Sequence, residues 1–315
     1  MVMDIGLFLA GVISLAGIYA ISTLGYNLQF GQTGLVNLGY VAYFAVGAYA
    51  SVILTIPHPG PHAAYMFGFG LPMWVGFIGA PIAAGIFAYI VGLPTLRLGI
   101  DYFVVVTFAV GEVLRYVLSN EVWLTNGLTG FHSLAQPFRE SFGPLVYEYF
   151  FAGLMIIILV ATYLFVNRIC RSPFGRALKS VRENESVCLS LGKKASSYKM
   201  KSFIIGAAIA GLAGSFYVRF TTLARPEIFI PAVTFTALLS MIIGGKGNNK
   251  GAVLGTFIFI FAVELTRFFQ VSAAYAIRIS PLRTLATGIM LIVILRYLPQ
   301  GIIKEVRVKG EELGR

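Results

Sequence analysis

The sequence predicts an all-α polytopic membrane protein with about nine transmembrane helices in one membrane domain. Hydrophobic residues make up 57% of the 315 positions and charged residues only 12%, and the mean hydropathy is +0.82. A soluble domain carries roughly 25% charged residues. Because lipid offers the backbone no hydrogen bonds, apolar segments of about 20 residues cross a bilayer as helices.

Nine apolar segments are expected to form the spans. The seventh is short, follows Pro226 and Pro231, and ends at Gly244 and Gly245. Two forms stay open for it: a full crossing, or a half-helix that turns back where other helices shield its backbone from lipid. The segments are 5–29, 35–56, 71–94, 101–119, 148–167, 201–223, 232–245, 251–267 and 281–297.

The basic residues predict the orientation of the chain. Nine of the 24 lie between Arg168 and Lys201, whereas the loop 120–147 contains only Arg139. By the positive-inside rule, the loop 168–200 and the tail 298–315 are cytoplasmic and the loop 120–147 is external. Nine spans then place the N-terminus outside and the C-terminus inside the cell membrane.

The polar residues exclude several classes of function. The chain has a net charge of +11, but nine of its 24 basic residues cluster between Arg168 and Lys201 as in a cytoplasmic loop, so no nucleic-acid partner is expected. The three histidines, His58, His62 and His132, lie in predicted outer loops, and prolines around the first two prevent a helical metal site. The chain has no P-loop and no convergent catalytic groups. We therefore expect neither enzyme activity, metal nor cofactor in this chain.

Two predicted spans carry ion pairs at helical spacing, Glu112 with Arg115 and Glu264 with Arg267. Glu112 lies about 16 Å along its helix from Asp101, near the midplane. A charge there costs about 2.5–3.5 kcal/mol on insertion scales, so it faces protein or water. A structural ion pair is the preferred interpretation of both. For Glu112, a place in the solute pathway and proton coupling stay open as alternatives.

Small and polar side chains mark two further features of the spans. Gly206, Ala210 and Gly214 recur every four residues, which predicts a closely packed helix face. Polar groups at the start of the second span need partners or water. We expect them near the solute pathway, with helix–helix hydrogen bonding as the alternative. These residues are Gln32, Thr33, Asn37 and Tyr40.

The loop 168–200 contains a predicted amphipathic helix from Glu183 to Leu191, ended by Gly192. Spacing alone leaves two interpretations of this helix. It lies on the membrane surface, held by anionic lipid, or it inserts its apolar edge into a groove on a partner protein. Charges on either side of that edge suit the polar rim of a small interface.

Several stretches of the sequence resemble the permeases of branched-chain amino acid ABC importers, of the LivM type. RSPFGRALKSVRENESVCLSLGKKASSYKMKSFIIGAAIAGLAGSFY is similar to the cytoplasmic coupling loop of that family and the span after it. LQFGQTGLVNLGYVAYFAVGAYAS is similar to its second-span signature. Further stretches agree in order: LRLGIDYFVVVTFAVGEVLR, LTNGLTGF and LLSMIIGGKGNNKGAVLGTFI.

The resemblance implies a permease subunit that works by alternating access. It implies a LivH-type permease partner, two ATP-binding subunits that hydrolyse ATP, and an external solute-binding protein. The substrate would be a branched-chain or other neutral amino acid; urea or short amides, and a secondary transporter, are the alternatives. The resemblance also favours ATPase docking by the loop 168–200. The coupling residues would be Arg182, Glu183, Asn184, Glu185, Val187, Leu191 and Gly192.

Overall fold

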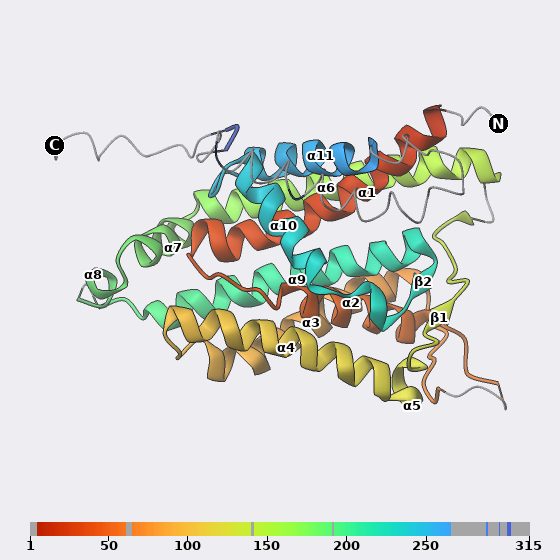
Figure 1. The fold of residues 1–315 in the computed structure, drawn as a ribbon, viewed down its shortest axis with the longest axis horizontal. Helices are drawn as coiled ribbons and strands as arrows, with labels where there is room; N and C mark the ends of the chain where they lie inside the picture. The colour runs from red at the N-terminus through yellow and green to blue at the C-terminus, as the bar shows by residue number, and fades with distance from the viewer. Residues whose placement is uncertain are drawn as a thin grey trace.

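The structure is a computed structural model that describes residues 5–60, 65–139, 142–190, 192–265, 288, 296 and 301–303. Its longer helices run side by side along the long axis of the molecule (Figure 1). The helices are α1 (Ile5–Tyr26), the π-helix η1 (Asn27–Gln32), α2 (Tyr40–Thr55), α3 (Met73–Thr95), α4 (Ile100–Asn120), α5 (Val122–Thr125), α6 (Pro144–Arg171), α7 (Pro173–Glu183), α8 (Glu185–Ser190), α9 (Ala195–Thr221), the 3-10 helix η3 (Pro226–Ile228), α10 (Pro231–Gly244) and α11 (Asn249–Leu265).

The predicted all-α membrane fold is confirmed. Among the described residues, six helical segments are long and apolar enough to cross a membrane, and α2 is a shorter apolar helix. The predicted eighth span corresponds to α11, and the ninth, 281–297, lies outside the described residues apart from two positions. The number nine is therefore not established. The six segments are Ile5–Gln32, Met73–Thr95, Ile100–Asn120, Leu145–Arg171, Ala195–Thr221 and Pro226–Gly244.

Helix α9 forms the centre of the bundle and packs against α1, α2 and α3. Small residues let these helices approach until their backbones touch. A Cβ atom added to Gly206 would lie 2.7 Å from the carbonyl oxygen of Gly25 in α1. A Cβ atom added to Gly214 would lie 2.0 Å from the carbonyl oxygen of Phe44 in α2. The closely packed face predicted for this span is confirmed.

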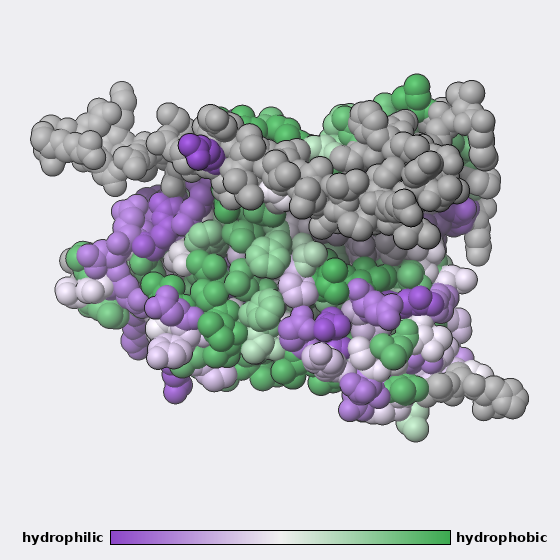
Figure 2. Space-filling view, in the orientation of Figure 1, coloured by the Kyte–Doolittle hydropathy of each residue, from purple (hydrophilic) through white to green (hydrophobic). Residues whose placement is uncertain are grey.

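Helix α3 places its small residues inside and its large ones outside. Isoleucines at every fourth position are exposed, including Ile82 and Ile86, which suits a face covered by lipid. Figure 2 shows apolar side chains over the middle of the visible face, with polar ones around α7 at one end and around α5 at the other. The inward residues of α3 are Gly76, Ala80, Ala84, Gly85, Ala88 and Gly92.

The second span is broken, so the prediction of one helix over 35–56 is only partly right. The chain leaves η1 at Gln32, runs without regular helix through 33–39, and enters α2 at Tyr40. A Cβ atom on Gly39 would lie 1.8 Å from the carbonyl oxygen of Thr107, which is about 10 Å along α4 from its start. Helix α2 therefore begins within the bundle rather than at its end.

Helices α10 and α11 form a hairpin that packs on α1. Helix α10 has 14 residues and is about 21 Å long, whereas the apolar segment from Pro226 to Gly244 has 19 residues and meets the length of a full crossing. At the closed end, a Cβ atom on Gly244 would lie 1.8 Å from the carbonyl oxygen of Gly251. The turn between these glycines lies beside η1.

A buried arginine docks the loop 120–147 onto the bundle. Arg219 of α9 is 3% exposed and donates to the carbonyl oxygen of Ala135 at 3.0 Å. It also donates to the Ser51 carbonyl oxygen at 3.2 Å and to the Thr55 hydroxyl. Ser51 and Thr55 lie at the C-terminal end of α2, so the arginine cation also lies at the negative end of that helix dipole. The strands β1 (Phe131–His132) and β2 (Leu223–Ala224) pair antiparallel nearby.

The contact between α2 and α9 gives a prediction for stability. In Gly47→Ala, the new Cβ atom would lie 2.2 Å from the Cα atom of Gly211, so two backbones must separate. We expect a loss of about 1–3 kcal/mol, seen as a lower Tm of the purified protein in detergent. The control is Gly153→Ala on α6, where nothing lies within 4 Å. Equal Tm values for the two variants would contradict the packing described.

Candidate functional site

The break between α1 and α2 gathers buried polar side chains inside an otherwise apolar bundle. They come from η1, from the segment 33–39, and from α9, α10 and α11, and each is at most 6% exposed. π-Helical turns and non-helical backbone at membrane depth are both common at functional sites. We call this set the polar break. Its members are Asn27, Gln29, Gln32, Thr33, Asn37, Ser202, Thr234 and Asn249.

One chain of hydrogen bonds joins α9 to the start of α2. Gln29 donates through Nε2 to the Phe203 carbonyl oxygen at 2.8 Å. Its Oε1 accepts from Asn37 Nδ2 at 3.0 Å. Asn37 Oδ1 in turn accepts from the backbone N–H of Gly39 at 3.1 Å. Asn37 therefore supplies a partner for the non-helical Gly39 N–H, and Gln29 fixes Asn37 to α9.

Hydroxyl groups hold η1 to α9. The Oγ1 atom of Thr33 lies 2.7 Å from the Oγ atom of Ser202. Each hydroxyl oxygen also lies 3.0 Å from the carbonyl oxygen of Leu28, so the two hydroxyl protons are shared among these three contacts. Ser202 is the member that belongs to α9, so a relative movement of α1 and α9 would break its contacts with Leu28 and Thr33.

The turn between α10 and α11 is tied to η1 in the same way. Asn27 donates to Asn249 Oδ1 at 2.9 Å and accepts from the Gly247 N–H at 3.0 Å. Gln32 Nε2 donates to the Gly247 carbonyl oxygen at 2.6 Å. The Lys246 ammonium lies 3.9 Å from the centre of the Phe30 ring. The end of α1 and this turn therefore form one connected unit.

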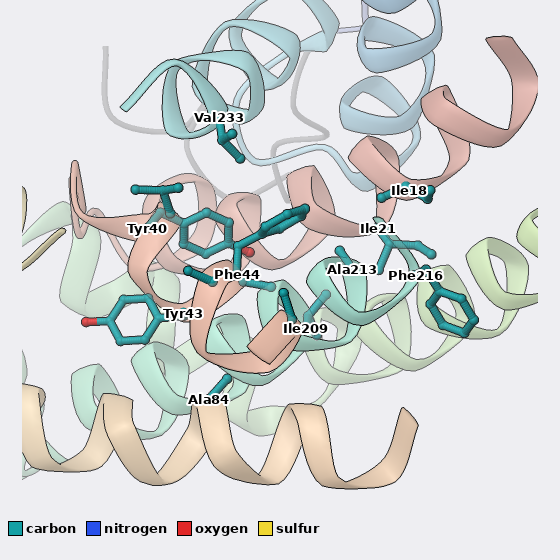
Figure 3. Close-up of a cluster of buried hydrophobic side chains, with 14 of the residues drawn as sticks. Ile18, Ile21, Tyr40, Tyr43, Phe44, Ala84, Ile209, Ala213, Phe216 and Val233 are labelled. Atoms are coloured by element: carbon teal, nitrogen blue, oxygen red, sulfur yellow. The ribbon is translucent and has the colours of Figure 1, made fainter. Parts of the chain in front are cut away.

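The first turn of α2 is closed by side chains from other helices. The Val41 N–H donates to Thr234 Oγ1 of α10 at 2.9 Å. The Tyr40 hydroxyl donates to the carbonyl oxygen of Ser22 at 2.8 Å and reaches that of Gly206 at 3.1 Å. Figure 3 shows Tyr40, Tyr43 and Phe44 of α2 among apolar side chains of the neighbouring helices. The polar break thus borders an aromatic core.

The predicted pathway residues separate into two places. Gln32, Thr33, Asn37 and Tyr40 meet in the polar break and make helix–helix hydrogen bonds, as the alternative interpretation expected. Their place in a pathway stays a prediction. Glu112 lies apart on α4.

The structure describes both members of one predicted ion pair and a single member of the other. The Arg115 guanidinium lies 2.6 Å from the Glu112 carboxylate, and both side chains are about one-quarter exposed, at 27% and 26%. This contact is the predicted ion pair on a partly exposed helix face. Glu264 is buried in α11, but its predicted partner, Arg267, lies outside the described residues.

The predicted coupling segment (residues 173–190) contains two helices, α7 and α8. The prediction of a helix from Glu183 to Leu191 is right for α8, which spans Glu185–Ser190, and wrong at its start, because Glu183 ends α7. Helix α7 begins after Ser172, whose side chain accepts from the Gly175 N–H. Asn184 is extended and ends α7, and its Oδ1 atom accepts from the Val187 N–H at 3.1 Å at the start of α8. The missed signals were the Ser-Pro pair that starts α7 and the asparagine that separates the helices.

Side chains of the coupling segment reach both sides of the polar break. Arg182 donates to the Gly31 carbonyl oxygen in η1 and lies 3.6 Å from the Glu183 carboxylate. Glu185 of α8 pairs with Lys199 of α9 at 2.7 Å. The segment is therefore fixed to η1 at one end and to α9 at the other.

Helix α8 presents apolar side chains outward. Val187 and Leu189 are 51% and 55% exposed, whereas Cys188 between them is fully buried. Leu191 lies outside the described residues. Gly192 has φ +72°, the left-handed conformation expected of a residue that ends a helix.

Most of the polar break has no local signal in the sequence. Each of its unpredicted members is a single polar residue in or beside an apolar span: Asn27, Gln29, Ser202, Thr234 and Asn249. Their partners lie 174 to 222 residues away in several cases. Within the described residues, no group of three or more His, Cys, Asp or Glu side chains is placed to hold a metal ion.

Comparison with known proteins decides the family. A family profile described as "Branched-chain amino acid transport system / permease component" matches residues 8–295. The chain belongs to this permease family. The permease is 30% identical over 319 residues to the high-affinity branched-chain amino acid transport system permease protein LivM of Escherichia coli K12, covering 94% of this chain and 70% of that protein.

The chain matches two further relatives over nearly their whole length. The probable LivM permease of Methanocaldococcus jannaschii is 28% identical over 326 residues, covering 92% of this chain and 91% of the relative. The LivH permease of Salmonella typhimurium is 25% identical over 309 residues, covering 94% of each. No solved structure matches the permease. The permease is of the LivM type and is a multi-pass membrane protein.

Asn37 gives a test of the polar break. In Asn37→Leu, Gln29 Oε1 and the Gly39 N–H lose their partners in a buried place, which costs about 1–3 kcal/mol. We expect a lower Tm of the purified permease. The control is Asn120→Leu, because Asn120 is exposed and makes one bond, to the Tyr116 carbonyl oxygen. A Tm that falls no further for Asn37→Leu than for the control would argue against the network.

Proposed function

We propose that this permease is one of two membrane subunits of an ATP-driven importer for branched-chain amino acids. The family match over residues 8–295 carries the proposal, and relatives named as LivM and LivH support pairing with a LivH-type subunit. These relatives do not favour urea or short amides. Two ATP-binding subunits and a solute-binding protein outside the membrane complete the importer.

The polar break is the proposed gate of the solute route. Its bonds link η1, α2, α9, α10 and α11, so opening it would separate several helices at once. An amino acid brings one carboxylate and one ammonium group, which need polar partners inside a bilayer. Exchange of protein–protein hydrogen bonds for bonds to the substrate suits alternating access. Glu112 lies on α4, which contributes no residue to the polar break, so it is not part of the proposed gate.

Helices α7 and α8 are the proposed docking segment for an ATP-binding subunit. Exposed Val187 and Leu189 supply an apolar contact, and Glu185 supplies charge at its rim. Arg182 contacts η1, and Lys199 belongs to α9. A movement of the docked segment would therefore act on two helices of the polar break.

The orientation follows from this assignment. The end of the bundle with α7 and α8 faces the cytoplasm, because ATP is there. The N-terminus is then outside and the C-terminus inside. The opposite end, where α5 and the paired strands lie (Figure 1), would receive the solute-binding protein.

Reconstituted uptake tests the function. Proteoliposomes that contain both permeases and both ATP-binding subunits, with the binding protein added outside, are expected to take up leucine only when ATP is inside. The control is the same vesicles with ADP. Uptake of urea but not leucine, or leucine uptake without ATP, would contradict the proposal.

With Asn37→Leu, leucine uptake per folded transporter is expected to fall; unchanged uptake would remove Asn37 from the proposed gate.

A single charge tests the docking segment. Val187→Asp places a carboxylate in the proposed apolar contact, so ATP-binding subunits should no longer co-purify and substrate-stimulated ATP hydrolysis should be lost. The permease should still insert, because Val187 is already 51% exposed. The control is Leu128→Asp at the opposite end of the bundle, where Leu128 is 62% exposed. Normal co-purification of Val187→Asp would contradict the docking assignment.

A further inference from the structure

A groove runs between α3 and α9 on the outer surface of the bundle. At the end that carries α7, it opens as a hollow of about 450 Å³. A second hollow of about 370 Å³ continues along the same two helices and shares Tyr89 and Ile204 with the first. The second hollow is lined by apolar side chains, among them Ile82, Ile86 and Ala208. The groove is therefore polar only at one end.

Two cations lie at the polar end of the groove. Arg97 follows the end of α3, and Lys201 lies in the second turn of α9; both line the hollow and both are exposed. In the part of the chain that the structure describes, neither side chain makes a hydrogen bond or an ion pair. Lys199 of α9, by contrast, is paired with Glu185. Arg97 and Lys201 thus bring to the groove two positive charges that have no partner among the described residues.

The start of α9 adds a second attraction for an anion. Ser196 and Ser197 line the hollow and form the first turn of this helix. Lys194 at the N-cap makes no side-chain capping bond. The positive end of the helix dipole and two hydroxyl groups therefore lie beside Arg97 and Lys201.

We propose that this groove binds an anionic phospholipid. The phosphate group lies between Arg97, Lys201 and the first turn of α9, and one acyl chain follows the apolar hollow past Tyr89 towards Ala208. Basic pockets between transmembrane helices at a membrane surface recognise anionic headgroups in this manner. A free phosphate would use only the polar end and would leave the apolar hollow unfilled. The proposal needs the membrane fold alone and does not depend on the transported substrate.

Such a lipid would join two helices that differ in their contacts. Helix α3 exposes a row of isoleucines on the outer surface of the bundle, whereas α9 forms the centre of the bundle and follows after α8 in the chain. The negative charge of a bound headgroup would offset part of the charge of Arg97 and Lys201 and hold the end of α3 against the first turns of α9. Charge at the membrane surface would thereby affect the position of α9.

Native mass spectrometry of the full-length permease in detergent tests this proposal, with phosphatidylglycerol and phosphatidylcholine of identical acyl chains as probes. We expect retention of phosphatidylglycerol over phosphatidylcholine. The double variant Arg97→Gln with Lys201→Gln should weaken phosphatidylglycerol binding by about tenfold or more. The matched control, Arg176→Gln with Lys193→Gln, also removes one arginine and one lysine at the same end, but neither residue lines the groove. It should retain the lipid.

A second pair of variants tests the apolar part without changing charge. Ala208→Phe fills the hollow and should also weaken phosphatidylglycerol binding, whereas Ile90→Phe, on an exposed face of α3 outside the groove, should not. Water-soluble glycerol phosphate at equal concentration should not displace the lipid. The proposal would be overturned if the permease retained both lipids equally. It would also be overturned if the control variant and the groove variant lost phosphatidylglycerol binding equally. Loss of bound phosphatidylglycerol when the two permeases assemble would assign the groove to the partner subunit instead.

Discussion

Backbone groups in a bilayer core find no water to bind, and the segment 33–39 has no helix of its own to satisfy them. Gly34 and Leu35 donate to carbonyl oxygens of η1, and side chains from the polar break supply further partners. Asn37 accepts from Gly39, Thr234 accepts from the first turn of α2, and Gln29 donates to α9. The interrupted second span exists because these partners surround it. The positions of η1, α2 and the turn between α10 and α11 all depend on these hydrogen bonds.

Short side chains such as Asn, Ser and Thr can bridge two helices only when the helix backbones are close. Glycine supplies that closeness in this fold. Gly206 meets Gly25, and Gly47 meets Gly211, with no room for a Cβ atom at either contact. These contacts bring Ser202 and Thr33 within 2.7 Å of each other. Small residues and the polar network are therefore parts of one arrangement, in which packing sets the distances that hydrogen bonding requires.

Features that depend on local composition could be predicted from the sequence. Apolar segments indicated the membrane helices, the glycines of α9 indicated close packing, and the spacing of Glu112 and Arg115 indicated their ion pair. Features that depend on distant partners could not. The interruption before Tyr40 is stabilised by α9 and α10, and a single sequence does not reveal which polar residues 174 or more positions apart will meet. The division of the coupling segment at Asn184 did have a local signal, in its capping residues.

The separation of Asn27 from Asn249 also affects how the protein is made. These two amides bond at 2.9 Å, yet 222 residues separate them in the chain. At about 5–20 residues per second, ribosomes need roughly 10–45 seconds to add that length of chain. During this time the first helix has left the ribosome with its amide groups exposed and without their final partner. The Asn27 amide therefore needs another polar partner until α11 is made, because an unsatisfied amide in a bilayer core is costly.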